Sequence, residues 1–390
     1  MDNIKISKNH IQMLIAMFIS GSTLITGGLT DAKQDTWLCV AAAYLLSLPL
    51  CWLFASLVKL PKDRDFFSGI IQVCGKIPGR ILCFLYALNA VHLCGQNLRF
   101  LAEFVHDVNM NETPLTAILV CVLIAAIYAV RNRLYVLVRL AGFALPFIFA
   151  SVGLTILLSV QDMDFTNMLP VLHSDWKQVS SGTFEYFSLA FGELVFCLPL
   201  LGAIDHQETV FPVLAKGSLM GFLLLLTVSL RNLFVLGYTN GVSAFPSYSA
   251  VSIISIGEFF TRIEVLIGIN LLFSGFFKIL VLLFFTCKSF SAALGFKDYE
   301  PLAGPCGILS LTTALLIFCN TGEMFSWQKY FAYFSLPLQL IAPAILLIIG
   351  KIRGRLKPGS TAKAEAPKPG TSRRKPAPLD RRAGRPTQAE

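Results

Sequence analysis

The feature that most constrains this chain is a series of ten apolar runs, each long enough to cross a lipid bilayer as a helix. A helix of about 20 apolar residues spans the roughly 30 Å hydrocarbon core. Of the 390 residues 55% are hydrophobic and only 14% charged, which excludes a soluble domain of this length. We therefore expect an all-α polytopic membrane protein. The spans are placed at 10–29, 36–57, 80–105, 114–131, 134–160, 184–204, 213–238, 260–294, 305–320 and 330–350.

Charge predicts the orientation of these spans. Lys and Arg gather in the connections after even-numbered spans, whereas the odd-numbered connections carry mainly Asp and Glu. The positive-inside rule then places both termini in the cytoplasm. Residues 246–260 are either an outer-loop helix or the start of the eighth span. The expected parts are a cytoplasmic N-terminus (1–9), a first five-helix repeat (10–160), an extracytoplasmic loop (161–183), a second five-helix repeat (184–350) and a cytoplasmic tail (351–390).

The tail is strongly basic. It holds 12 Lys and Arg against 3 Asp and Glu, an excess that equals the formal net charge of +9. Its Pro, Gly and Ala cannot bury enough surface to offset the entropy of ordering, so we expect disorder. Cations just below the last span favour contact with anionic membrane lipid over binding to a specific partner. The tail has no aromatic residues to stack on bases, so no nucleic-acid partner is expected.

Motifs for catalysis or metal binding are missing from the sequence. The ten cysteines include no C-x-x-C pair, and the five histidines are dispersed. There is no phosphate loop, G-x-S-x-G elbow or H-E-x-x-H helix. An enzyme is therefore the least expected class, and no cofactor or metal is predicted.

The first span is interrupted by small and polar residues. The stretch FISGSTLITGG places Gly, Ser and Thr at 21–23 and 26–28. Unpaired backbone groups cost several kcal/mol in hydrocarbon, so a broken helix at this depth is tolerated only where it is buried by protein or lines a polar cavity. The interruption is therefore a candidate binding site. The alternative is that small residues merely allow close helix packing.

A similar interruption follows about 171 residues later, in the sixth span. The stretch FEYFSLAFGELVFCLPLLGAI carries Gly192 and Glu193, with Pro199 beyond them. The same offset places the long third span on the long eighth span. Transporters built from inverted repeats carry broken helices at matching positions of their two halves. The sequence thus predicts a five-plus-five inverted repeat with broken helices one and six.

Short motifs in a shared order carry a family resemblance. The motifs are Gln12 to Gly21, AKQDTW (32–37), LRFLAEF (98–104), ETPL (112–115), FGELV (191–195), FPSY (245–248) and TRIE (261–264). Together they resemble the spore germination permease family, the B subunits of nutrient germinant receptors, over about residues 4 to 352. The family is related to the amino acid, polyamine and organocation transporters, which implies a LeuT-like fold.

This resemblance implies a sensor that binds an amino acid or similar small nutrient in the inner spore membrane and triggers germination and ion release. It also implies A and C receptor subunits as partners. A secondary amino acid transporter or permease is the alternative, since both need the same pocket. Freed backbone groups at broken helices suit a zwitterion. Carried onto this chain, the ligand-binding residues are Gly21, Ser22, Thr23, Phe191, Gly192 and Glu193.

Charged residues inside the spans need a partner or a function. Glu193 either contacts ligand or a cation, or makes a structural hydrogen bond. Arg99 and Glu103, four residues apart, are expected to pair for structural reasons. A polar face of the eighth span is either an ion or water path, or a seam that fixes helix packing. That face consists of Glu264, Asn270, Ser274 and Lys278.

Two further expectations concern the outer surface and ion coupling. Gln34 and Asp35 either cap the second span or shape an outer vestibule. Some proton-coupled members of the transporter superfamily carry a lysine in span five in place of sodium. Span five of this chain has no lysine, so coupling through such a residue is not supported.

Overall fold

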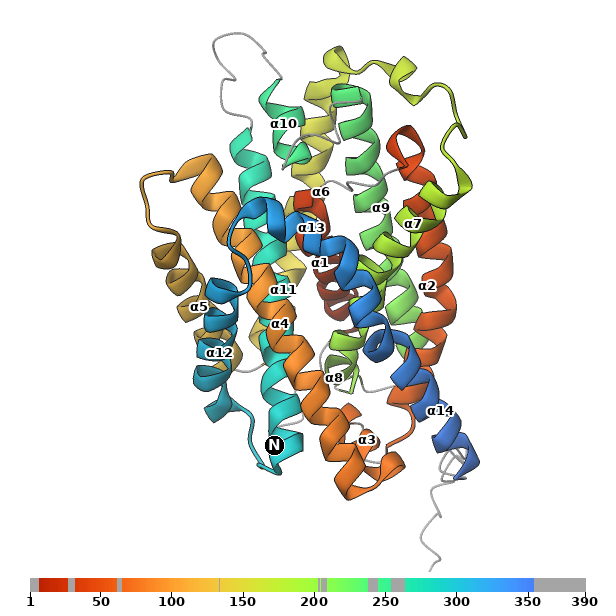
Figure 1. Ribbon diagram of the computed structural model, residues 1–390, viewed down its shortest axis with the longest axis vertical. Coiled ribbons are helices and arrows are strands. Elements are labelled where there is room, and N and C mark those ends of the chain that lie inside the picture. The colour runs from red at the N-terminus through yellow and green to blue at the C-terminus, as the bar shows by residue number, and fades with distance from the viewer. Residues whose placement is uncertain are drawn as a thin grey trace, which may run out of the picture. The chain divides into compact units, whose positions relative to one another are not determined.

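The computed structural model describes residues 7–26, 32–61, 65–132, 134–202, 204, 209–237, 245–253 and 264–353. Within these ranges every regular element is a helix (Figure 1). Nearly all of the predicted tail and the loop from Gly27 to Asp31 lie outside the described residues.

Helices of the first half follow the predicted spans closely. The third span is longer than expected at both ends, and a short helix precedes it. The elements are α1 (Lys8–Thr26), η1 (Lys33–Asp35), α2 (Thr36–Val58), α3 (Phe66–Cys74), α4 (Lys76–Asn109), α5 (Leu115–Arg131) and α6 (Leu134–Ser159).

The second half contains two places where the helical pattern changes within a span. They are the π-helical turns η4 and η9, the first of which is followed by the 3₁₀ segment η5. The elements are η2 (Val160–Asp162), η3 (Phe165–Met168), α7 (Trp176–Tyr186), η4 (Phe187–Phe191), η5 (Gly192–Cys197), α8 (Leu198–Leu201), α9 (Val210–Leu236), α10 (Pro246–Ser252), α11 (Glu264–Leu294), η8 (Glu300–Leu302), α12 (Ala303–Leu316), α13 (Thr321–Leu336), η9 (Pro337–Ile341) and α14 (Ala342–Ile352).

Each of the ten predicted spans coincides with a described helix, but not every one meets the length and hydropathy of a membrane span. Seven helices among the described residues do so, and eight if the segment 300–316 and the start of α13, bent by 106°, are counted as one span. The number ten therefore stays a prediction. The ambiguous stretch after residue 245 forms the separate short helix α10, and residues 254–263 lie outside the described part.

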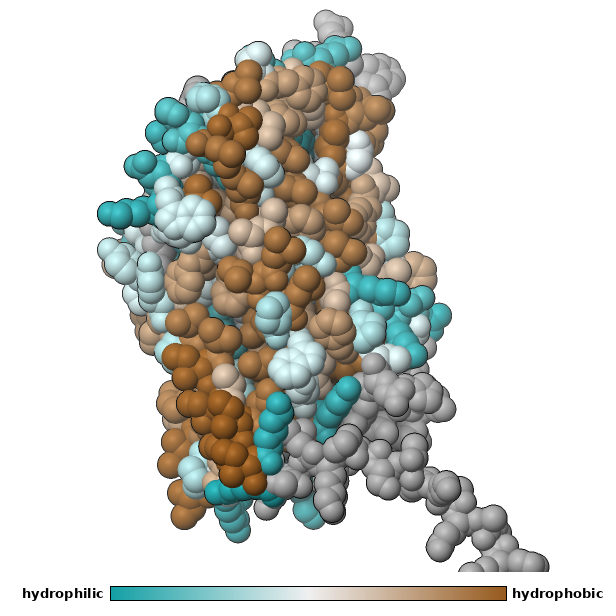
Figure 2. Space-filling model, turned by 90° about the vertical axis from the view of Figure 1, so that its right-hand side faces the viewer, coloured by the Kyte–Doolittle hydropathy of each residue, from teal (hydrophilic) through white to brown (hydrophobic). Residues whose placement is uncertain are grey.

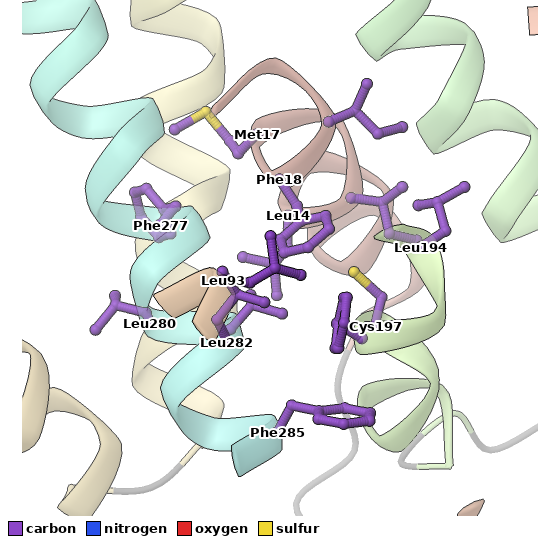
Figure 3. Packing of buried hydrophobic residues seen from close by; sticks show 14 of the residues in the cluster. Leu14, Met17, Phe18, Leu93, Leu194, Cys197, Phe277, Leu280, Leu282 and Phe285 are labelled. Atoms are coloured by element: carbon purple, nitrogen blue, oxygen red, sulfur yellow. The ribbon is translucent and has the colours of Figure 1, made fainter. Parts of the chain in front are cut away.

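The helix α1 lies at the centre of the bundle and packs against α9, α11 and α6 (Figure 1). Gly217 and Gly221 of α9 allow the closest approach, because a Cβ atom at either position would lie within 2.9 Å of Ile15 or Ile19. Small residues four apart let two helix backbones come close together, as is common in membranes. Apolar side chains of α1, α4, α11 and η5 then fill the interior (Figure 3).

Large apolar side chains also cover the outside of the bundle. Phe143, Tyr128 and Trp52 each expose more than half of their surface. Figure 2 shows a face where apolar side chains predominate over the middle. A soluble protein would avoid such a surface, whereas lipid tails accommodate it. The structure thus agrees with the membrane assignment from composition.

The loop between η3 and α7 is attached to the start of α2 by Asp35. Its carboxylate accepts hydrogen bonds from the backbone N–H groups of Leu172 at 2.8 Å and Ser174 at 2.9 Å. The Ser174 hydroxyl donates to the Ala32 carbonyl at 2.7 Å. Asp35 precedes α2 but makes no capping bond to it. The capping alternative is therefore wrong for Asp35, which instead positions the loop beside η1.

Candidate ligand-binding site

The sixth span loses regular α-helical geometry where the sequence predicted an interruption. The helix α7 passes into the π turn η4 at Phe187, then into the 3₁₀ segment η5 at Gly192, and α8 resumes at Leu198. A π turn is wider than an α-helix and a 3₁₀ turn is tighter, so the hydrogen-bond pattern changes three times between Tyr186 and Leu198. Three predicted site residues, Phe191, Gly192 and Glu193, lie at this junction and are buried.

The first span behaves differently from the expectation. The helix α1 is continuous from Lys8 to Thr26, so no interruption begins at Gly21. Serine and threonine in this helix bond back to it: the Ser20 hydroxyl donates to Ala16 O at 2.7 Å, and that of Thr23 to Ile19 O at 3.3 Å. The break predicted at 21–28 is therefore wrong for residues 21–26. Gly27, Gly28 and the side chain of Ser22 lie outside the described residues.

An ion pair lies beside the junction in the sixth span. Lys278 Nζ of α11 is 2.7 Å from Glu193 Oε2, and these side chains are 1% and 2% exposed. The ammonium group also lies 5.6 Å from the centre of the Phe18 ring in α1. Removing two charges from water costs several kcal/mol for each ion, so such a pair persists only where each charge compensates the other. Spans one, six and eight therefore meet at a single charged contact.

Gly21 explains how the lysine reaches this position. A Cβ atom at residue 21 would lie 2.6 Å from Lys278 Cδ and 2.9 Å from its Cβ, closer than side chains approach one another. The Ser274 hydroxyl lies 3.5 Å from the Gly21 carbonyl on the same contact. The absence of a side chain at Gly21 thus lets Lys278 cross α1 toward Glu193. Gly21 therefore permits close helix packing. Through Lys278, that packing connects the predicted site residues of span one with those of span six.

Residues of the tenth span complete the surroundings of the junction. The Ser188 hydroxyl lies 2.9 Å from that of Ser335 and 3.1 Å from Gln339 Oε1. A side chain at Gly192 would overlap Gln339 Oε1. Ser188 and Gln339 belong to the two π turns, η4 and η9. The sequence analysis missed these residues, because serine and glutamine in apolar spans resemble ordinary packing positions.

The polar face of the eighth span divides into three parts. Asn270 Oδ1 accepts a hydrogen bond from Ser151 of α6 at 2.6 Å. Ser274 contacts α1, and Lys278 pairs with Glu193. The side chain of Glu264 lies outside the described residues. The contacts of Asn270 and Ser274 are those expected of a seam between helices.

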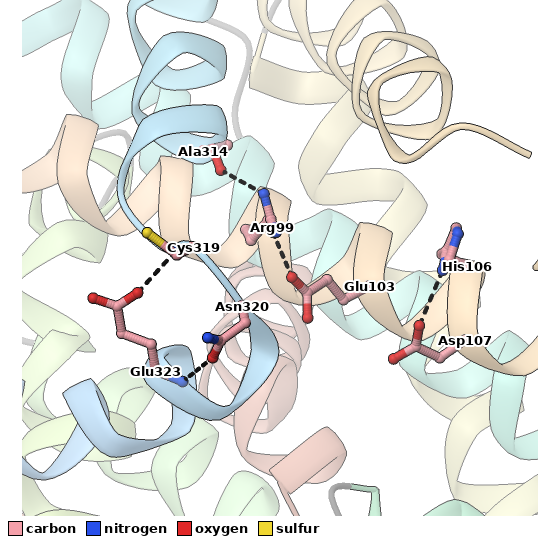
Figure 4. Close-up of polar contacts among 8 residues, drawn as sticks. All are labelled: Arg99, Glu103, His106, Asp107, Ala314, Cys319, Asn320 and Glu323. Carbon is pink, nitrogen blue, oxygen red and sulfur yellow. Dashed lines mark hydrogen bonds and ion pairs between the residues drawn. The ribbon is translucent and has the colours of Figure 1, made fainter.

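Three more charged side chains in the spans have partners; Arg99 and Glu103 are drawn in Figure 4, and Arg231 lies elsewhere in the bundle. Arg99 Nε lies 2.5 Å from Glu103 Oε1, which confirms the predicted pair on α4. Arg99 also donates to the Ala314 carbonyl of α12 at 3.4 Å. Arg231 of α9, which the sequence analysis did not single out, is buried and donates to neutral oxygens. They are Asn232 Oδ1 (2.7 Å), Thr155 Oγ1 (3.2 Å) and the Ser247 carbonyl (3.2 Å).

Solved structures share this fold. The structure of Mhp1, a nucleobase-cation-symport-1 family transporter, in a closed conformation with bromovinylhydantoin bound, matches with a TM-score of 0.65 at 11% identity. The match covers 87% of this chain and 76% of Mhp1. A mutant of the Eremococcus coleocola manganese transporter matches with a TM-score of 0.55 at 13% identity, over 87% of this chain and 76% of its own. The fold is therefore LeuT-like.

Sequence comparisons point to one family. Spore germination protein KB of Bacillus subtilis (strain 168) is 26% identical over 356 residues, which cover 90% of this chain and 95% of that protein. The putative spore germination protein YfkT of the same organism is 24% identical over 327 residues, covering 82% and 88%. The model of the spore permease family, described as spore germination protein, matches residues 5–321. The chain belongs to the spore germination permease family.

Proposed function

We propose that this chain is the nutrient-recognising subunit of a spore germinant receptor, and that its ligand is an amino acid or a similar small zwitterion. The observation that carries the proposal is the buried pair of Lys278 and Glu193. A family of germination proteins and a LeuT-like fold support it in general terms. The two charges of the pair indicate which chemical groups the ligand carries.

A zwitterion is the ligand that can replace this ion pair without leaving a charge uncompensated. Its carboxylate would take the place of Glu193 beside Lys278, and its ammonium group would take the place of Lys278 beside Glu193. A neutral ligand that separated the two side chains would leave two buried charges without partners, at a cost of several kcal/mol. The ligand-binding residues proposed are Gly21, Ser22, Thr23, Phe191, Gly192 and Glu193, with Lys278 added from the structure.

The link between binding and germination follows from the same contact. Lys278 lies across α1 and holds α11 to the sixth span. Opening the pair would change the packing of three helices at once, which provides a two-state element that a nutrient can bias. Asn270, Ser274 and Lys278, with Glu264, are proposed to border the ion or water path that this change affects. We further propose that the chain acts together with the receptor A and C subunits. It lies in the inner spore membrane with both termini in the cytoplasm.

A secondary transporter is the second candidate, and the likeness to transporters of LeuT-like fold favours it. Vesicles containing the purified protein separate the two functions. Saturable binding of a labelled amino acid without accumulation inside the vesicle supports the sensor. Sustained uptake that continues beyond one molecule per protein supports transport. Absence of both binding and uptake for all twenty amino acids would contradict the proposed ligand class.

A further inference from the structure

The amide group of Gln339 lies in the interior of the tenth span with half of its hydrogen-bonding capacity unused. The residue is 1% exposed. Its oxygen accepts a hydrogen bond from Ser188 at 3.1 Å, whereas its nitrogen has no partner among the described residues. An amide N–H that is buried without an acceptor loses the hydrogen bond that it would make to water, and this destabilises the folded protein. Such a group in a native protein calls for an explanation.

The surrounding contacts show that the amide is held in place. Ser188, which binds its oxygen, is itself 2.9 Å from the hydroxyl of Ser335. The carbonyl of the neighbouring Leu338 is satisfied by the Tyr86 hydroxyl of α4 at 2.9 Å. Both of these oxygens thus have a donor within the chain, whereas the Gln339 N–H donors have no acceptor in the part of the chain that the structure describes. An acceptor from outside the chain would complete the set.

The position of the amide connects it with the ion pair. Gln339 Oε1 occupies the space that a side chain at Gly192 would fill, and Glu193 is the next residue. Both spans form a π turn at this contact, in η4 and η9. A π turn inserts one residue into a helix, redirects the side chains around it, and is frequent at functional sites. The two irregular turns therefore place the free N–H donors beside the junction that holds Glu193.

We propose that Gln339 is a ligand-binding residue whose amide N–H donates to a carboxylate oxygen of the nutrient. This inference rests on the proposed function. An N–H donor needs a hydrogen-bond acceptor. Of the two charged groups of a zwitterion, the ammonium group only donates, so the carboxylate oxygens are the acceptors. Gln339 and Lys278 then bind the carboxylate together, and Glu193 binds the ammonium group. The tenth span becomes a fourth contributor to the site and determines preference for a carboxylate.

The test compares Gln339→Leu with Gln339→Glu in the full-length protein in lipid nanodiscs. Glutamate keeps the size and the oxygen facing Ser188, but it replaces the N–H donors with a second oxygen. The probes are a mixture of ¹⁴C-labelled proteinogenic amino acids, then the amino acid that binds, and its decarboxylated amine. Asn97→Leu on α4 is the control, because Asn97 is also a buried amide but donates within its own helix, to Leu93 O at 2.8 Å.

Both Gln339 variants are expected to bind the amino acid at least ten-fold more weakly, while their weak affinity for the amine stays within two-fold of wild type. Asn97→Leu should keep wild-type affinity. Unchanged amino-acid binding in a folded Gln339→Glu protein overturns the inference, and so does an equal loss in Asn97→Leu. Wild-type protein that binds no amino acid contradicts the proposed function itself, which separates the two failures.

Discussion

Lys278 and Glu193 form an ion pair of opposite charges, and both side chains are almost fully buried. Sequence reasoning identified both as charges within spans but assigned them to different groups. Glu193 entered the predicted ligand site, whereas Lys278 entered the polar face of the eighth span. The rule that a charge inside a span needs a partner could have joined them, since they are opposite in sign. Pairing across helices depends on tertiary packing, which hydropathy does not reveal.

Removal of one partner of this pair should destabilise the protein strongly. Glu193→Gln leaves the ammonium group of Lys278 buried without its counter-charge, at a cost of about 3–5 kcal/mol. Thermal unfolding of the purified protein in detergent measures the effect. The double variant Glu193→Gln with Lys278→Met should regain most of the stability but should not bind amino acid. A single variant that melts at the wild-type temperature would show that the pair is not formed in solution.

Gly21 should be intolerant of any larger side chain. In Gly21→Leu the new side chain occupies the space of Lys278 Cδ, so the lysine can no longer cross α1. We expect the nutrient dose needed for a response to rise at least ten-fold after the response is normalised to protein abundance. Spore germination curves and immunoblots measure the two quantities.

The matched control for Gly21 is Gly153→Leu on α6, because a Cβ atom at Gly153 meets nothing within 4 Å. That variant should respond as wild type does. A normal response in Gly21→Leu would count against the site. A loss in both variants would show that any bulky residue in a span has this effect.

At the scale of elements, the sequence predicted the existence and type of nearly every helix, because apolar runs of span length have few other solutions in a membrane. The change of pattern in the sixth span was also predicted, from Gly192 and Pro199. The start of α13 at Thr321 was missed. Asn320 Oδ1 accepts from Glu323 N, and Glu323 Oε2 accepts from Cys319 N, both at 2.8 Å (Figure 4). An Asn followed three residues later by Glu is a helix-start signal that the sequence did display.

The π turns were beyond prediction from sequence. A π turn changes the spacing of backbone hydrogen bonds and not the polarity of the residues, so hydropathy does not reveal it. The energy that the irregular turn costs is offset by contacts between helices, which depend on the tertiary structure. The interruption expected at Gly21 failed for the converse reason. Glycine permits an irregular backbone but does not require one, and in α1 it admits a neighbouring side chain while the helix continues.

The outer loop should loosen when its attachment to η1 is weakened. Asp35→Ala removes the acceptor for the N–H groups of Leu172 and Ser174, so residues 161–175 should become accessible to protease at least several-fold faster. Limited proteolysis followed by mass spectrometry measures this. Asp162→Ala in the same loop is the control and should digest at the wild-type rate. Equal digestion of the two variants would contradict the role of Asp35.

At the scale of the whole molecule, composition was sufficient for the membrane class, and family motifs for the LeuT-like arrangement. Orientation rests on charge alone and is open to test. Cys319 is exposed at the connection between α12 and α13, which the positive-inside rule places outside. A membrane-impermeant maleimide should therefore label Cys319 in intact cells.

A cysteine introduced at Lys59, after α2, should react only after the membrane is permeabilised. Cys319→Ser is the control that should lose the labelling of the first measurement, and it is the background for the second. Labelling of the double variant Lys59→Cys with Cys319→Ser in intact cells would show that the orientation is the opposite of the one inferred from charge.

The positive charge that meets Glu193 is covalently part of the chain. Its occupancy therefore does not depend on the concentration of any ion in the medium, and screening by salt hardly reaches an enclosed pair. A protein with this arrangement should keep the same resting conformation at low and at high ionic strength. Under the proposed function, it leaves that conformation when one molecule supplies both a carboxylate and an ammonium group.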